Sequence, residues 1–111
     1  MLFNMPYAKD VIIKNMTGEE LKDFYLIYEG LEKSPYKIST IASNKQKTIN
    51  LVLMYLTKPT NLRLLYNRNG EKKEVVVYEN LRKDDLRTII LTINMDEDDF
   101  KVDTVIQEGT V

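Results

Sequence analysis

The sequence predicts an all-β protein: an antiparallel β-sandwich of seven or eight strands, immunoglobulin-like in broad architecture. Three observations lead to this prediction. Short runs rich in β-branched and aromatic residues follow one another at spacings of roughly 8–14 residues, with turn-forming residues between them. Several of these runs alternate apolar and polar residues, which is the period of a half-buried strand. No strong helical period occurs outside residues 19–28.

Length and composition suit a single domain over residues 1–111, in which 43% of the residues are hydrophobic. A chain of this size buries about two-thirds of its surface on folding, which is enough for one core. We expect residues 1–8 to be a flexible N-terminal segment. Cys is absent, so the fold has no disulfide to rely on.

The first half of the chain contains three clear strand candidates besides one ambiguous segment. Residues 9–15 (KDVIIKN) are β-branched and run into an Asn-Met-Thr-Gly turn signal. Residues 36–41 and 47–55 each alternate their apolar residues and are separated by the turn-like sequence ASNK. We predict a strand in each of the three segments.

Residues 17–30 (TGEELKDFYLIYEG) are compatible with a helix or with a strand. The T-x-x-E spacing at the start is that of a capping box, which favours a helix. Phe24–Tyr28, however, is an unbroken run of good strand formers, and a helix would place Leu26 and Ile27 on its polar side. We therefore predict a central, doubly buried strand over residues 23–29, with the helix as the alternative.

The second half of the chain reads as two hairpins. Residues 62–66 and 74–78 flank Asn69-Gly70, the strongest hairpin signal in the sequence. Residues 87–95 and 100–106 alternate well and are joined by the polar sequence MDEDDF.

Four short motifs recur along residues 11–94: Asn15-Met16-Thr17-Gly18, Ile27-Tyr28-Glu29-Gly30, Leu62–Tyr66 and Gly70-Glu71-Lys72. Together they resemble a group of small, uncharacterised proteins that is common in Gram-positive bacteria of the Firmicutes. The group's pattern is N-x-T-G, then I-x-Y-E/D-G, then L-x-L-x-Y and a polar turn with G-K/E-K. The resemblance implies an all-β domain, supports the strand in residues 23–29 and brings no catalytic residues.

The composition excludes several kinds of active site. With no His and no Cys, the chain cannot build a Ser–His–Asp triad, a thiol nucleophile or the usual structural zinc site. It has neither a P-loop nor a G-x-G-x-x-G motif. We therefore expect no enzyme, no catalytic residues and no cofactor.

The densest group of oxygen ligands is Asp96, Glu97, Asp98 and Asp99, with Asp103 nearby. Ca²⁺ takes six to eight oxygens, but the run lacks the D-x-[DN]-x-[DN]-G loop pattern. We predict that it holds no metal, so that added Ca²⁺ leaves the melting temperature unchanged. A solvated turn and a contact with a protein partner are the other interpretations.

Charge is unevenly distributed, and tyrosine is frequent. Residues 96–111 carry one Lys and six acidic residues, whereas residues 1–95 carry 15 basic and 11 acidic residues. Because acidic residues are interleaved with the basic ones, we expect no nucleic-acid binding. Tyr25, Tyr66 and Tyr78 lie in expected strands, where tyrosine serves either packing or binding.

We expect a non-catalytic protein-binding module, an immunity or inhibitor-type protein that caps a partner protein. This is an argument by type of protein. The alternatives are a structural or accessory subunit of a larger bacterial, phage or plasmid assembly, and a calcium-dependent binding module. The expected partner contacts are Asp96, Glu97, Asp98, Asp99, Tyr25, Tyr66 and Tyr78. With no signal peptide and no membrane span, we expect a cytoplasmic monomer or weak homodimer.

Overall fold

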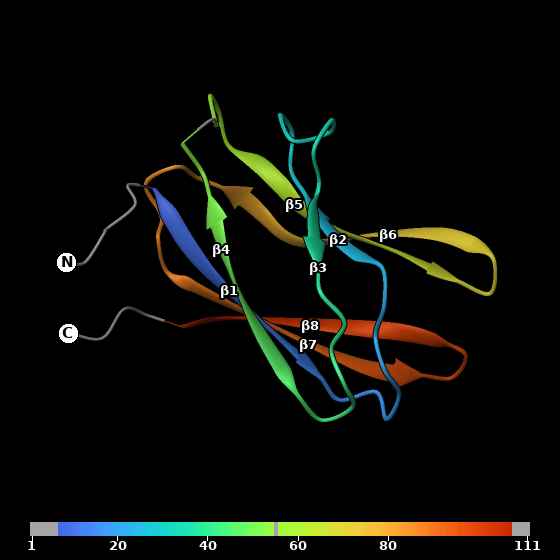
Figure 1. The fold of residues 1–111 in the computed structure, drawn as a ribbon. Coiled ribbons are helices and arrows are strands. Elements are labelled where there is room, and N and C mark those ends of the chain that lie inside the picture. The colour runs from blue at the N-terminus through green and yellow to red at the C-terminus, as the bar shows by residue number, and fades with distance from the viewer. Residues whose placement is uncertain (1–6, 55, 108–111) are drawn as a thin grey trace.

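The computed structural model describes residues 7–54 and 56–107. Within these residues it contains eight strands and no helix, which confirms the all-β prediction (Figure 1). The strands are β1 (Ala8–Asn15), β2 (Phe24–Ile27), β3 (Tyr36–Ile38), β4 (Gln46–Val52), β5 (Thr60–Arg68), β6 (Glu71–Leu81), β7 (Thr88–Asp96) and β8 (Asp99–Gln107).

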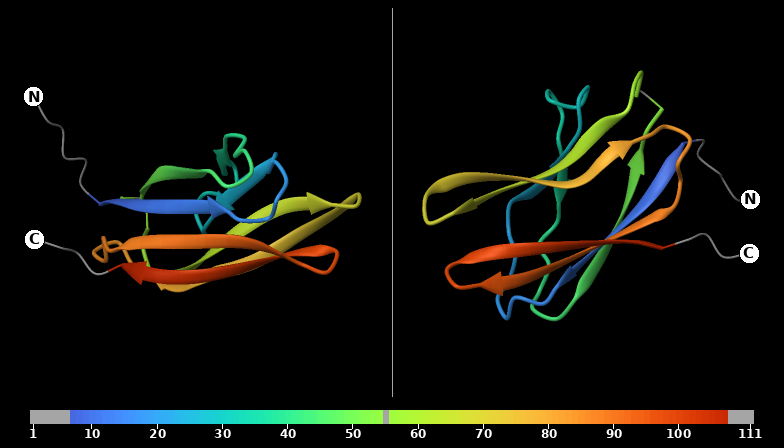
Figure 2. Two further views of the ribbon diagram at one scale, coloured as in Figure 1. Left: turned by 90° about the horizontal axis from the view of Figure 1, so that it is seen from below. Right: turned by 180° about the vertical axis from the view of Figure 1, so that it is seen from behind.

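Two four-stranded sheets make up the fold (Figure 2). The first sheet has the order β4-β1-β7-β8 and the second the order β3-β2-β5-β6. The immunoglobulin-like arrangement is not confirmed, because an immunoglobulin sandwich keeps its first two strands in one sheet and here β1 and β2 lie in different sheets.

One pairing departs from the antiparallel prediction. β1 and β7 are parallel, with Val11 opposite Ile89, whereas the other pairings between named strands are antiparallel. Parallel neighbours need a long connection, and the five intervening strands provide it. The alternation of apolar residues reveals which faces are buried but not the direction of a neighbouring strand.

The core lies between the inner faces of the two sheets. β1 contributes Val11 and Ile13 to it, and β7 contributes Ile89, Leu91 and Ile93, all with no exposed surface. Their alternation with more exposed neighbours produces the period of two seen in the sequence. Each such side chain contributes about 1.5–3 kcal/mol by leaving water.

The ambiguous segment forms a strand rather than a helix, as predicted, but β2 covers only Phe24–Ile27 of the predicted residues 23–29, and the half-buried Tyr25 shows that the strand is not buried on both faces. β2 lies between β3 and β5, and Phe24, Leu26 and Ile27 are buried. The T-x-x-E sequence before it forms a turn rather than a helix start, because the Thr17 hydroxyl accepts a hydrogen bond from the Glu19 N–H at 3.1 Å. The good strand formers of β2 therefore prevail over the local capping signal.

Asn15 explains the N-x-T-G motif structurally. Its side chain is fully buried, and its Nδ2 donates to the carbonyl oxygens of Glu19, Ile41 and Ala42 at 2.7, 3.0 and 3.2 Å. Its Oδ1 accepts from the Thr17 N–H and hydroxyl at 3.0 and 2.6 Å. The motif therefore joins two connecting segments by satisfying buried backbone groups.

The N-terminal prediction needs one correction. Ala8 already pairs with Val52 and Tyr7 accepts a hydrogen bond from the Leu53 N–H, so the sheet begins inside the segment predicted to be flexible. Residues 1–6 lie outside the described part of the chain, as does Tyr55, where the fourth strand was predicted to end.

Candidate interaction face

Two hairpin turns lie at one end of the molecule. The β5–β6 turn has Asn69 and Gly70 at φ values of 53° and 79°, the positive pair of a type I′ turn, as the sequence predicts. The β7–β8 turn consists of Glu97 and Asp98, and Glu97 has a φ of 57°. Glutamate rarely adopts this conformation, so contacts elsewhere must hold the second turn in place.

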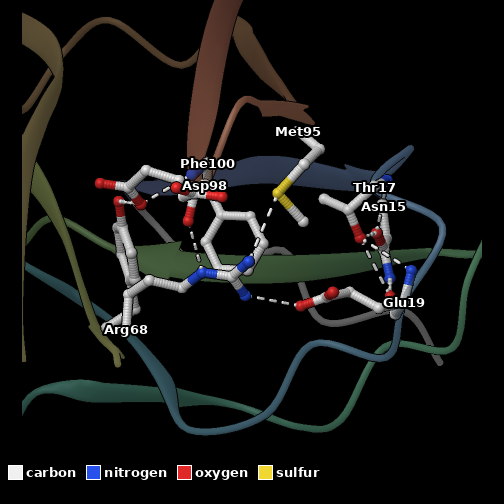
Figure 3. Close-up of polar contacts among 9 residues, drawn as sticks. Asn15, Thr17, Glu19, Arg68, Met95, Asp98 and Phe100 are labelled. Atoms are coloured by element: carbon white, nitrogen blue, oxygen red, sulfur yellow. Dashed lines mark hydrogen bonds and ion pairs between the residues drawn. The ribbon is translucent and has the colours of Figure 1, made fainter. Parts of the chain in front are cut away.

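Arg68 connects the two turns (Figure 3). From the end of β5 its Nε donates to the Asp98 carbonyl at 2.9 Å, and its NH1 group donates to Glu19 Oε1 at 2.7 Å. The guanidinium lies 4.6 Å from the centre of the Phe100 ring and also contacts the Met95 sulfur at 3.6 Å. Arg68 therefore holds the β7–β8 turn by charge, hydrogen bonding and ring contact together.

Three aromatic rings pack beneath Arg68 and join the two sheets. Phe24 and Tyr66 stack with ring centres 5.0 Å apart, and Phe100 lies within 5.5 Å of each of them. Such pairs contribute about 0.5–1.5 kcal/mol beyond the area that they bury. Because Phe100 belongs to β8 and the other two rings to the second sheet, this cluster fixes the β7–β8 turn against that sheet.

Asp99 turns back towards the body of the protein. It accepts hydrogen bonds from the Tyr66 hydroxyl at 2.8 Å and the Phe100 N–H at 2.6 Å, and Lys73 Nζ lies 3.7 Å away. Desolvation opposes ionisation of Asp99, but these donors outweigh it and hold its pKa below the ordinary value. Desolvation, together with the bond to Asp99, raises the pKa of Tyr66 to about 12.

The other three acidic side chains of the turn face solvent. Asp96, Glu97 and Asp98 are exposed, and no side-chain hydrogen bond or ion pair involves them within the described residues. We call these three residues the acidic tip. No group of three acidic side chains among the described residues is arranged to hold a metal ion. The acidic tip thus consists of three carboxylates that have no ion-pair partner among the described residues, on a turn that Arg68 holds in place.

A hollow of about 410 Å³ lies on the outer side of the second sheet. Tyr25, Leu65 and Pro35 supply its apolar surface, and polar or charged residues surround them. Lys73 lines the hollow and also lies 3.7 Å from Asp99, the residue that follows the acidic tip, whereas no residue of the acidic tip lines the hollow itself. We call the hollow and the acidic tip together the interaction face.

The three candidate tyrosines differ in position. Tyr25 is half-buried in the hollow, where a partner could reach its ring. Tyr66 is only 4% exposed and belongs to the aromatic cluster, so the prediction of an accessible anchor there is corrected. Tyr78 is half-buried elsewhere, with its hydroxyl 3.2 Å from Asp85 Oδ2 and Lys9 Nζ 5.6 Å from its ring centre.

Tyr78, Asp85, Lys9 and Arg87 form a second cluster, which has a structural role. Lys9 is fully buried, donates to the Asp85 carbonyl at 2.8 Å and lies 3.6 Å from its carboxylate. Desolvation lowers the pKa of Lys9, partly offset by Asp85. Arg87, bonded to Asp85 through its side chain at 2.8 and 2.9 Å, is the largest cause of the lowered pKa of Asp85. The cluster anchors the β6–β7 connection to β1.

Sequence reasoning missed the central roles of Arg68, Lys9 and Asp85. For Lys9 a signal existed. It lies at an even spacing from Val11 and Ile13 along β1, so its side chain is on the same face of the strand and points to the core. For Arg68 no local signal existed, since its contacts come from two distant segments, the turn at Glu19 and the β7–β8 hairpin. Within residues 7–54 and 56–107, no helix is long and apolar enough to cross a membrane.

Comparison with known proteins gives information on the fold alone. No protein-family model and no curated protein matches the chain. The NMR structure of a protein from Eubacterium rectale is similar with a TM-score of 0.58 at 15% sequence identity, covering 95% of this chain and 93% of that one. Eubacterium rectale belongs to the Firmicutes, in keeping with the group that the sequence motifs resemble.

Proposed function

We propose that the protein is a non-catalytic protein-binding module of the immunity or inhibitor type, and that it binds its partner through the interaction face. The observation that supports this most is the hollow containing Tyr25 and Leu65, together with the β7–β8 turn, which Arg68 holds in place and which carries three carboxylates without an ion-pair partner among the described residues. An accessible aromatic side chain within an apolar hollow is typical of the residues that contribute most to binding energy.

The two parts of the interaction face would have different roles. The hollow, with Tyr25 as anchor, would determine how long a complex lasts, because desolvated aromatic contacts mainly affect dissociation. The acidic tip would accelerate encounter with a basic partner, since exposed charges act over distance and are screened by salt. Bracing by Arg68 reduces the entropy that the turn would lose on binding.

The proposal is tested by capturing partners from the native host with the wild-type chain and with Tyr25→Ala in parallel. A protein retained by the wild type and lost with Tyr25→Ala is identified by mass spectrometry, purified and studied by surface plasmon resonance. We expect Tyr25→Ala to accelerate dissociation roughly tenfold or more at every salt concentration. We expect neutralisation of the acidic tip (D96N/E97Q/D98N) to slow association, most clearly at low salt.

Tyr36→Phe is the matched control, because Tyr36 is another half-buried tyrosine of the second sheet whose hydroxyl bonds to the Asn50 carbonyl. It should leave both rates unchanged. A captured partner whose binding is indifferent to Tyr25→Ala and to the neutralised acidic tip would contradict the proposed face. A partner that is a component of a multi-subunit assembly would instead favour the structural or accessory subunit.

A further inference from the structure

β8 is an edge strand whose backbone is open on one side. It pairs with β7, which is its neighbour within the first sheet. Val102 lies opposite Ile93, whose carbonyl accepts a hydrogen bond from Met16 on the side away from β8. In an antiparallel ladder both members of such a pair turn their N–H and C=O groups outwards. Phe100 lies two residues before Val102 and therefore turns its backbone groups to the same side. In agreement with this, its N–H bonds to the Asp99 carboxylate.

Backbone carbonyls at the opposite edge of the first sheet are bonded to the second sheet, whereas β8 bonds to the second sheet through a side chain, the Thr104 hydroxyl, which donates to the Val77 carbonyl of β6 at 2.6 Å. At the opposite edge the hydroxyls of Tyr28 and Tyr36 donate to the outward carbonyls of Val52 and Asn50 on β4, at 2.7 and 3.0 Å. On β8, no described residue hydrogen-bonds to the outward backbone groups of Val102. An unpaired strand edge of this kind is a template for a further strand.

The side chains flanking Val102 determine which strand would fit. Lys101 and Asp103 are exposed on the outer face of the sheet and form no ion pair within the described residues. A single charge at an edge commonly prevents pairing. A Lys and an Asp two positions apart do not prevent pairing in this way. When a second copy is related by a two-fold axis, the Lys of each copy faces the Asp of the other.

The direction of the backbone N–H and C=O groups and the positions of the charged side chains together select one register for the pairing of β8 with β8 of a second copy. If Val102 faces Val102 of a second copy, Lys101 faces Asp103 in both directions, as a close pair without ladder hydrogen bonds. Centring the ladder on Asp103 or on Lys101 would place like charges opposite each other. Centring it on Thr104 would leave both charges opposite uncharged residues, Val105 and Gln107.

We propose that the protein self-associates through β8, which pairs antiparallel with β8 of a second copy about a two-fold axis at Val102. The two first sheets then form one continuous eight-stranded sheet. The Asp99 carboxylate, which occupies the Phe100 N–H, limits the ladder at its end. Because a single strand pair is a small interface, we expect a dissociation constant on the order of 0.1–1 mM.

Charge exchange between the two positions tests the register. K101D and D103K each place like charges opposite one another in a dimer of identical copies, so each variant alone should remain at the 13.0 kDa mass of one chain. An equimolar mixture of the two should dimerise at least about tenfold more tightly than either alone, since both contacts are then between opposite charges. The K101D/D103K exchange variant should dimerise like the wild type.

Sedimentation equilibrium of the full chain between about 10 μM and about 1 mM provides the measurement. K37D, on an exposed position of β3 in the other sheet, carries the same charge change as K101D and should dimerise like the wild type. Circular dichroism checks that each variant is folded. A wild-type chain that is monomeric at the highest concentration, or a mixture no tighter than its components, would overturn the proposal.

Discussion

The β5–β6 and β7–β8 hairpins both end in two-residue turns at the same end of the molecule, but their turns are held by different forces. Asn69 and Gly70 adopt positive φ values at little cost, so local conformational preference is sufficient for the first turn. Glu97 adopts a positive φ at a cost of about 1–2 kcal/mol, which the second turn must recover from tertiary contacts.

Those tertiary contacts come largely from the β5–β6 hairpin. Arg68 and Lys73 of β5 and β6 reach Asp98 and Asp99, and Tyr66 both packs against β8 and bonds to Asp99. The dependence therefore runs in one direction: β7–β8 needs β5–β6 for its turn, whereas the β5–β6 turn would form by itself. Four groups of substitutions test this relationship.

Tyr66→Ala should have the largest effect, lowering the free energy of unfolding by about 3–5 kcal/mol, because it removes a buried ring from the aromatic cluster. Tyr66→Phe should cost about 1 kcal/mol, since it keeps the ring and removes only the bond to Asp99. Urea denaturation measures both. Equal losses in the two variants would show that the hydroxyl, not the ring, holds the hairpins together.

Arg68→Ala should lower the free energy of unfolding by about 1–2 kcal/mol through loss of its charged hydrogen bonds and ring contact. Hydrogen exchange should accelerate at the β7–β8 turn and stay unchanged at the β5–β6 turn. Arg63→Ala is the control on the same strand, because Arg63 forms an ion pair with the exposed Glu74. Faster exchange at both turns would refute the one-way dependence.

Glu97→Gly should raise the free energy of unfolding by about 0.5–1 kcal/mol, because glycine adopts the positive φ without strain. Glu97→Gln separates backbone from charge, since it neutralises the side chain and retains the strain. Gly70→Ala should destabilise, although an added Cβ meets no atom within 4 Å there, so its cost is purely conformational. Thermal denaturation measures the stability of these variants. A melting temperature of Glu97→Gly at or below that of the wild type would contradict this account.

The pH dependence gives the smallest effect. The lowered pKa of Asp99 means that its contribution is present above the unfolded value of about 4 and is lost as the pH falls through the folded value. With solvent screening the contribution is less than about 1 kcal/mol. Asp99→Asn should therefore flatten the loss of stability between pH 5 and pH 2 in urea titrations, whereas Asp98→Asn, with an exposed carboxylate, should not.

Much of the fold could be predicted from the sequence because strand formation is governed by local patterns. Alternation, runs of strand-forming residues and turn signals together placed a strand in each of the eight segments, and the run from Phe24 to Ile27 prevailed over a capping signal. Two features could not be predicted in this way. Alternation is the same for parallel and antiparallel neighbours, so the β1–β7 pairing was missed, as was the division of strands between sheets.

The candidate site was less predictable than the fold. The acidic turn was found because its residues are consecutive, and Tyr25 because a tyrosine in a strand serves either packing or binding. Arg68 was not found, because its partners at Glu19, Met95 and Asp98 are distant in sequence. Tyr66 was assigned to binding rather than to the core because a tyrosine in a strand serves either purpose.

The parallel pairing of β1 with β7 also determines the order in which the protein can be assembled during synthesis. β1 occupies the middle of its sheet, yet Val11 finds its partner only in Ile89. While the chain emerges from the ribosome, β1 can pair with β4 alone and one of its sides stays open. Such non-local topologies fold in milliseconds to seconds. The nascent chain therefore exposes an aggregation-prone strand until β7 has been made, a period in which chaperones would bind it.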